Sequence, residues 1–336
     1  MKKLFFLSAL AALFFACQND NRPAPASSTP TSEPSATGLS LLTEANPAWQ
    51  HGNLRLYPIV ADAALMEAQS EVQHLKTLAE GMKTPGFRIT EQKQFGRSND
   101  RTYNILTVQN KSQDTIFMMS GDVVTGGNQD RVIARDQAVA PRTVKNLDVF
   151  CVEQNRWQYT DSTATPNEKA IYAFRGYYNV ASPQVRQAVQ RTNNQQEVWA
   201  AVARVTKANG ATSSTSTYAA LETAADSKAK RDAYLRQLSQ PLTEIPNVVG
   251  IVAVSGDKVL GVDVFGHNDL FLREYTALLH GFAAEAATGG SSPTLSEQEV
   301  QRVFGQVARL TSPTATATEG AGKFARNGKW VHLYSK

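Results

Sequence analysis

The chain has only two cysteines, Cys17 and Cys151, so no framework of disulfide bonds can hold its fold together. It also lacks an apolar run of the ~20 residues that a transmembrane helix needs, because the run Leu4–Ala16 is shorter. With 42% hydrophobic residues, the chain is able to bury a core of its own. We therefore expect a globular protein whose stability comes from that core.

A large surplus of positive charge is missing too. The 34 basic and 30 acidic residues give a net charge of +4, and two of the basic residues, Lys2 and Lys3, lie in the N-terminal segment described next. A protein that binds nucleic acid neutralises phosphates with a surplus of Lys and Arg. The balanced charge therefore argues against nucleic acid as a partner.

The first 16 residues are typical of a bacterial export signal. Lys2 and Lys3 precede the apolar run Leu4–Ala16, and Cys17 follows directly. This order resembles a lipobox, whose cysteine is acylated and anchors the protein to a membrane. The alternative is a cleaved signal followed by an incidental cysteine. We predict an exported lipoprotein, anchored through Cys17 to the inner or outer membrane of the cell envelope, on the periplasmic or the surface face.

The composition divides the chain into three segments. Residues 1–16 are the predicted signal peptide, and residues 17–45 hold the lipidated Cys17 and a stretch rich in Pro, Ser and Thr. Such a stretch has too few large apolar side chains to offset its ordering entropy, so we expect a disordered tether. Residues 46–336 are expected to form a single domain, with a helical insertion at 183–245.

Short strand-like runs dominate the first half of this domain, and helical patterns are concentrated in the second half. Small turns separate the strands, which favours antiparallel pairing. The predicted fold class is therefore α+β, with an antiparallel strand-rich core and helices concentrated in the C-terminal half. The strands are expected at 53–60, 87–91, 102–108, 115–119, 130–135 and 147–153, and two hairpins at 248–265 and 322–334. Helices are expected at 66–82, 194–205, 230–240, 268–286 and 296–307.

Three further expectations concern the helical half of the chain. Residues 209–228 are small, polar and repetitive, so they are expected to form a mobile connection. Pro241 is expected to end the helix at 230–240. The helix at 268–286 is expected to be capped by Asn268 or Asp269.

Glycines and polar groups are densest between residues 121 and 157. A turn here either offers backbone N–H groups to an anion or is an ordinary hairpin turn. Its residues are Gly126, Gly127, Asn128 and Gln129. Asp130 and Arg131 follow, and alternation with Ile133 puts Arg131 and Arg135 on one strand face. That face is either solvated or the cationic wall of a site.

A second polar group ends the expected strand at 147–153. A period of two places Cys151 and Glu153 on the same face, at the end of an apolar row. Burial raises the pKa of a carboxyl there unless an arginine such as Arg156 lies close. Glu153 either accepts hydrogen bonds from a ligand or forms a structural pair with an arginine. Trp157 either stacks on a sugar or base or closes the end of the core.

Several chemical signatures are missing from the sequence. The five histidines have no metal-ligand spacing, so no metal is predicted, and neither a Walker pattern nor a Gly-x-Ser-x-Gly elbow occurs. Cys151 lacks the electropositive setting of a reactive thiol and is interpreted as a small buried hydrophobe. No cofactor is identified. A hydrolase would need Glu153 opposite Asp130 or Asp263, with the two carboxylates less than ~10 Å apart.

Several motifs together resemble a known family. They are Gly126–Arg131, Val149–Glu153, the pair Arg156 and Trp157, Gly261–Gly266, and the expected helix Leu270–Ala286. They resemble an uncharacterised prokaryotic family named for its association with ADP-ribosylglycohydrolase and rhodanese-phosphatase genes. The likeness covers most of residues 48–336. The resemblance implies an association with nucleotide-sugar or ADP-ribose chemistry and assigns no catalytic residue.

Three functions are compatible with this pattern. The preferred one is a membrane-anchored binding module for a small polar or anionic ligand, similar to a sugar or a nucleotide. Its candidate site consists of Gly126, Gly127, Gln129, Asp130, Arg131, Glu153, Arg156 and Trp157. The second is an envelope scaffold whose motifs are structural, and the third is a hydrolase that uses the paired carboxylates.

Overall fold

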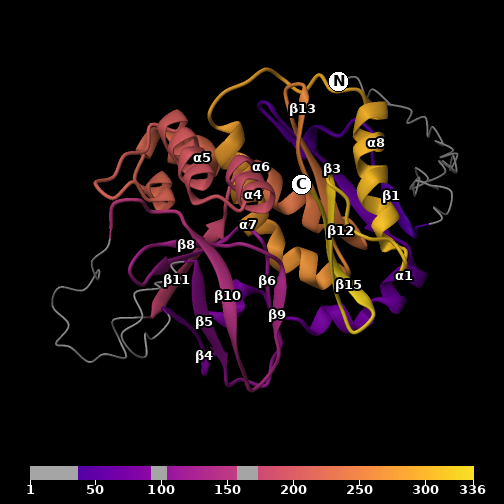
Figure 1. Cartoon of the computed structure of the whole chain (residues 1–336). Coiled ribbons are helices and arrows are strands. Elements are labelled where there is room, and N and C mark those ends of the chain that lie inside the picture. Colours follow the sequence, from indigo (N-terminus) through magenta and orange to yellow (C-terminus); the bar gives the residue numbers. More distant parts are fainter. Residues whose placement is uncertain (1–36, 92–103, 157–172) are drawn as a thin grey trace, which may run out of the picture. The chain divides into compact units, whose positions relative to one another are not determined.

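The N-terminal strands of the domain pair with its C-terminal hairpins. The computed structural model describes residues 37–91, 104–156 and 173–336, and among these seven strands form one antiparallel sheet (Figure 1). The strands are β1 (Leu39–Leu41), β2 (Gln50–His51), β3 (Leu54–Ala61), β12 (Val248–Ser255), β13 (Lys258–Phe265), β14 (Ala321–Arg326) and β15 (Lys329–Ser335). Their order is β1-β3-β12-β13-β15-β14, with β2 paired to β3. The hairpins β12–β13 and β14–β15 confirm the two hairpin predictions.

Each face of this sheet carries a core because successive side chains of a strand point to opposite faces. The covering helices are α6 (Ala225–Thr243), α7 (Asn268–Ala286) and α8 (Glu297–Ala308). On β12, Ile251 and Ala253 pack in the cluster with α6 and α7. Val252 and Val254 pack in the cluster with α8 on the opposite side (Figure 1). The sheet is therefore the middle of three layers.

A second antiparallel sheet carries the predicted site. Its strands are β4 (Phe87–Glu91), β5 (Ile105–Asn110), β7 (Asp122–Gly126), β8 (Arg131–Ile133), β10 (Thr143–Cys151) and β11 (Phe174–Val180), in the order β11-β7-β8-β10-β5-β4. An antiparallel bridge between Thr90 and Ala173 joins its two edge strands, so the sheet closes on itself at that end. An apolar core lies within it and includes Ile89, Val108, Val124, Ile133 and Val149.

Helices and short elements complete both cores. They are α1 (Ala63–Ala68), α2 (Leu78–Gly81), α4 (Pro183–Thr192), α5 (Gln195–Ala208), the two paired strands β6 (Ile116–Met118) and β9 (Gln137–Val139), and the 3₁₀ helices η1 (Pro47–Trp49), η2 (Ser70–His74), η3 (Tyr218–Glu222) and η4 (Arg309–Thr311). Val185 of α4 and Val198 of α5 pack against Val132 of β8, on the outer face of the closed sheet. At Gly281 of α7 a Cβ atom would lie 2.7 Å from the Ala181 carbonyl oxygen, so glycine permits this close approach.

The α+β class, the antiparallel sheets and the concentration of helices at 183–311 are confirmed. The helix predicted at 66–82 is wrong, because α1, η2 and α2 replace it. Leu75 is extended, and Thr77 begins a new helix through a capping box with Glu80. In the helical half, His267 rather than Asn268 caps α7.

Two predictions about disorder and one about a helix end are also wrong. Leu39 is buried in β1, so the predicted tether 17–45 extended too far toward the C-terminus. The other domain boundaries remain a prediction. The connection predicted at 209–228 contains η3, whose Tyr218 is buried. Pro241 lies inside the last turn of α6 instead of ending it. Within the described residues, no helix has the length and apolar character needed to cross a membrane.

Candidate functional site

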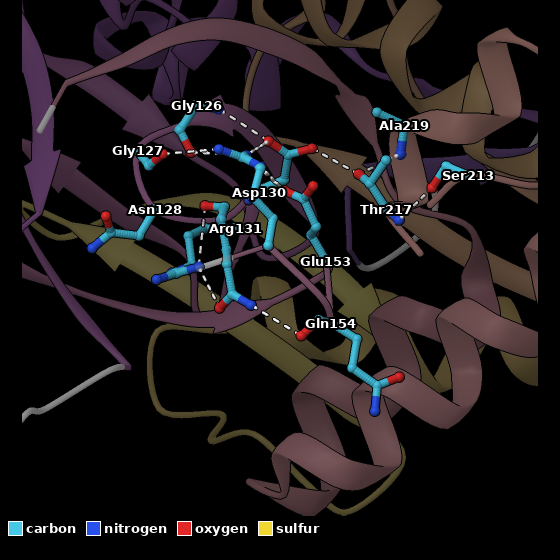
Figure 2. A network of polar contacts seen from close by, with 12 residues as sticks. Gly126, Gly127, Asn128, Asp130, Arg131, Glu153, Gln154, Ser213, Thr217 and Ala219 are labelled. Carbon is cyan, nitrogen blue, oxygen red and sulfur yellow. Dashed lines mark hydrogen bonds and ion pairs between the residues drawn. The ribbon is translucent and has the colours of Figure 1, made fainter. Parts of the chain in front are cut away.

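Seven of the eight predicted site residues meet at one end of the closed sheet, where β7 and β10 end and β8 begins (Figure 2). The eighth, Trp157, lies outside the described residues, as does the predicted lipidation residue Cys17. The turn from β7 to β8 needs its glycines. Gly127 has a φ of +55°, and a Cβ atom there would lie 2.6 Å from the Phe174 ring.

The turn does bind carboxylates through its backbone N–H groups, but these carboxylates belong to the chain itself. The N–H of Gly126 donates to Asp130 Oδ1 at 3.0 Å, and the N–H of Asp130 donates to Glu153 Oε2 at 3.0 Å. The N–H of Asn128 donates to Glu91 Oε1 at 2.9 Å. Two of the turn's predicted donors for an external anion, the N–H groups of Gly126 and Asn128, are therefore already used.

Arg156 contacts both the turn between β7 and β8 and the segment that follows β10. Its Nη2 lies 2.6 Å from Glu153 Oε2 and 3.0 Å from Asp130 Oδ1, and its Nη1 donates to the Gly127 carbonyl at 2.9 Å. Burial alone would lower the pKa of Arg156, but the carboxylates of Glu153 and Asp130 raise it. Glu153 is 3% exposed and Asp130 is 6% exposed. This arrangement matches the structural interpretation of a Glu–Arg pair.

Thr217 completes this network and was not predicted. Its hydroxyl donates to Asp130 Oδ2 at 2.7 Å (Figure 2). The N–H of Tyr218, the next residue, donates to the Val152 carbonyl at 2.9 Å. Burial raises the pKa of Asp130, and the hydrogen bond from Thr217 opposes that rise. Thr217 also caps η3 by accepting from the N–H of Ala219.

Arg131 has a different environment from Arg156. It is 1% exposed, and its Nη1 donates to the carbonyl and the side-chain Oε1 of Gln129 at 3.1 and 3.3 Å. Its Nη2 donates to Glu91 Oε1 at 3.4 Å, which is the salt bridge that Arg131 forms within the described residues. Within the described residues, the Nε of Arg131 has no hydrogen-bond partner. The buried guanidinium therefore has one hydrogen-bonded counter-charge, at the long end of the hydrogen-bond range, and one unused donor.

Glu91 was also missed by the sequence-based prediction, although its signal was present. Phe87, Ile89 and Glu91 alternate along β4, so the carboxyl follows two buried apolar residues on the same face. The same alternation led to the prediction of Glu153, which lies two residues after the end of β10. Glu91 lies at the same end of the closed sheet because β4 and β10 both end there.

The predicted shared face of Arg131 and Arg135 is wrong. β8 ends at Ile133, and Arg135 is an exposed residue that pairs with Asp148 at 3.2 Å. Cys151 is a buried free thiol, and burial raises its pKa. It therefore behaves as the small buried hydrophobe that was predicted.

The carboxylates proposed for a hydrolase divide into two groups. Asp130 and Glu153 contact the same nitrogen of Arg156, so they lie well within ~10 Å of each other. Asp263 belongs to another cluster, in which it pairs with Arg186 at 2.6 Å and with His332 at 3.1 Å. Within the described residues, no group of three acidic, His or Cys side chains is placed to hold a metal ion.

The fold and the site together define an α+β protein with a buried, charged turn at the end of a closed antiparallel sheet. Residues 43–333 match the model of the ARG and Rhodanese-Phosphatase-superfamily-associated Protein domain (ARPP-1), and the chain belongs to this family. Neither the curated proteins nor the solved structures contain a significant match to the chain.

Proposed function

We propose that this chain is a membrane-anchored, extracytoplasmic lipoprotein whose ARPP-1 domain binds a small polar ligand at Arg131. The observation that carries the proposal is the buried guanidinium of Arg131, with an unused Nε donor and a carboxylate no closer than 3.4 Å. A buried donor that makes no hydrogen bond is costly, even though Nη2 of the same guanidinium is bonded to Glu91. A ligand oxygen that accepts from Nε would remove that cost.

The charged side chains around Arg131 limit the classes of ligand that the site can bind. Three carboxylates, Glu91, Asp130 and Glu153, face two guanidiniums at this end of the sheet. A ligand with several negative charges would be repelled by the carboxylates that are not neutralised. Among the predicted classes, a sugar-like ligand or one with a single negative charge therefore fits better than a polyphosphate.

The exposure of the residues suggests the direction of entry. Arg131 and Gln129 are buried, while Glu91, Asn128 and Arg156 are partly exposed around them. Ligand pockets commonly combine such partly exposed rims with a few buried polar groups that fix orientation. The ligand would approach along this rim and place one oxygen at Arg131.

A hydrolase with paired carboxylates is less well supported. Nη2 of Arg156 lies between Asp130 and Glu153, where the bond to be cleaved would have to lie. An envelope scaffold with a purely structural network remains the main competitor. If the chain is such a scaffold, we expect that no small molecule stabilises it against unfolding.

A thermal-shift screen tests the binding proposal. The mature chain with Cys17→Ser would be screened against sugars, nucleotides, ADP-ribose and inorganic phosphate. A ligand at 100 times its dissociation constant adds ~2.7 kcal/mol, which raises the melting temperature by several degrees. We expect the shift to disappear in Arg131→Gln and to persist in Arg135→Gln, which removes an exposed arginine. No shift across the panel would favour the scaffold.

The lipid anchor needs a separate test because it rests on residues 1–17 of the sequence alone. Cells would be labelled with a radioactive fatty acid while they express the chain. We expect the label to enter the wild-type chain and not the Cys17→Ala variant. Equal labelling of the wild-type chain and the Cys17→Ala variant would contradict the lipid anchor and would leave the binding proposal unaffected.

A further inference from the structure

Arg131 and Glu91 contact each other, and each of them keeps one unused polar atom. Nη2 of Arg131 donates to Glu91 Oε1 at 3.4 Å, and the Asn128 N–H donates to the same oxygen at 2.9 Å. Within residues 37–91, 104–156 and 173–336, Oε2 of Glu91 accepts no hydrogen bond and Nε of Arg131 donates none. An unused acceptor and an unused donor therefore lie on two side chains that are in direct contact.

The other nitrogens of Arg131 determine which edge of its guanidinium a ligand can use. Nη1 donates to the carbonyl and to the side-chain Oε1 of Gln129, at 3.1 and 3.3 Å. In the planar guanidinium the Nε–H lies on the side of Nη2, the nitrogen that contacts Glu91. The Glu91 side chain is 11% exposed, whereas Arg131 is buried behind it. A ligand therefore meets the acceptor of Glu91 and the donor of Arg131 along one edge.

The charges at this end of the closed sheet argue against an anionic group at that edge. The network contains three carboxylates, of Glu91, Asp130 and Glu153, and two guanidiniums, of Arg131 and Arg156. Negative charge is thus in excess, and an added anion would increase the excess where charges are screened less than in water. An ionised carboxylate or phosphate also has no hydrogen to donate to Oε2 of Glu91.

Hydroxyl groups satisfy both unused atoms without adding charge. A hydroxyl oxygen accepts hydrogen bonds through its lone pairs and donates one through its O–H. We propose that the ligand is a neutral sugar, bound through two adjacent hydroxyl groups, one accepting from Arg131 Nε and the other donating to Glu91 Oε2. The inference rests on the binding function proposed above, and it adds the class of ligand and Glu91 as a ligand-binding residue.

A series of matched sugars tests the ligand class with the unaltered site. The mature Cys17→Ser chain would be titrated calorimetrically with glucose, galactose, mannose and ribose, with the monodeoxy analogues of each, and with glucuronate and glucose 6-phosphate. We expect a neutral sugar to bind and one of its monodeoxy analogues to bind at least ~10-fold more weakly, because that analogue leaves a charged partner without its hydrogen bond. Tighter binding of glucuronate or glucose 6-phosphate than of every neutral sugar would overturn the inference, as would equal binding of every monodeoxy analogue and its parent.

Glu91→Gln tests the assigned residue. Glutamine keeps an acceptor for the Asn128 N–H but places an amide donor where Oε2 of Glu91 lies. We expect the affinity for the neutral sugar to fall at least ~10-fold in Glu91→Gln and to stay unchanged in Asp148→Asn, whose carboxylate pairs with the exposed Arg135. If Glu91→Gln does not fold, the series of matched sugars decides the question.

The two proposals fail in different ways. Unchanged binding in Glu91→Gln together with lost binding in Arg131→Gln would overturn the inference and leave the proposed function intact. Unchanged binding in both variants, or no binding of any compound to the wild-type site, would overturn the proposed function and the inference with it.

Discussion

Arg131 and Arg156 lie in one network, yet replacing each by methionine is expected to affect stability very differently. Arg156→Met leaves Asp130 and Glu153 buried without the guanidinium that contacts both, at 3.0 and 2.6 Å. Breaking a buried ion pair by removing one partner costs about 3–5 kcal/mol. We expect a loss of unfolding free energy in that range, because methionine fills much of the arginine's space but supplies no donor.

Arg131→Met is expected to cost much less. Within the described part of the chain, Arg131 forms a salt bridge with Glu91 alone, at 3.4 Å, and Glu91 keeps its hydrogen bond from the Asn128 N–H. Glu91 is partly exposed, so water hydrates the carboxylate that is left behind, and removing the guanidinium also removes the buried Nε donor that has no partner. We expect a change of about 1 kcal/mol or less, in either direction.

Urea unfolding measures both free energies on the same scale. Arg135→Met provides the control, because an exposed pair such as that of Arg135 and Asp148 contributes only about 0–1 kcal/mol. Equal losses for Arg156→Met and Arg131→Met would refute the distinction between a structural arginine and a ligand-binding one. A larger loss for Arg131→Met would refute it more strongly.

Two further predictions concern single contacts. Thr217→Val keeps the side-chain shape but removes the hydrogen bond to Asp130, so we expect urea unfolding to show a loss of about 1.5–3 kcal/mol, and an unchanged stability would contradict the bond. His332 lies between Asp136 and Asp263, whose charges outweigh burial and raise its pKa to about 9. Its contribution of ~3 kcal/mol to the free energy of unfolding is complete below pH 6.5 and is lost as the pH rises through 9. We therefore expect the melting temperature of the wild type to fall more across that window than that of His332→Gln. Identical slopes of melting temperature against pH for the two proteins would contradict the assignment.

Local patterns in the sequence predicted much of the fold. The alternation of Val248–Ser255 and Lys258–Phe265 around a short turn is enough to define a hairpin, and the structure contains it. The period of the pattern does not reveal where a helix breaks. The interval 66–82 has helical spacing, but the pairing of Lys76 with Ile116 in another strand interrupts it. Tertiary pairing of this kind overrides local propensity.

Most members of the candidate site were predicted from the sequence, but Glu91, Thr217 and the pairing of the side chains were not. Density of glycine and charge brought out Asp130, Arg131, Glu153 and Arg156, and these side chains do meet. The sequence alone does not distinguish Arg131 from Arg156, because they differ in which carboxylates they contact in the folded chain. Thr217 contacts Asp130 from 87 residues away, and no local pattern encodes that contact.

The most direct test of Arg131 as the ligand-binding group is calorimetric titration of the best ligand from the thermal-shift panel. Wild-type chain, Arg131→Lys and Arg135→Lys would be compared. Lysine keeps the positive charge but lacks the Nε donor and the planar fork of arginine. We predict that Arg131→Lys weakens binding at least ~10-fold, equivalent to ~1.4 kcal/mol, while Arg135→Lys leaves it unchanged. Equal affinity in all three proteins would contradict the account.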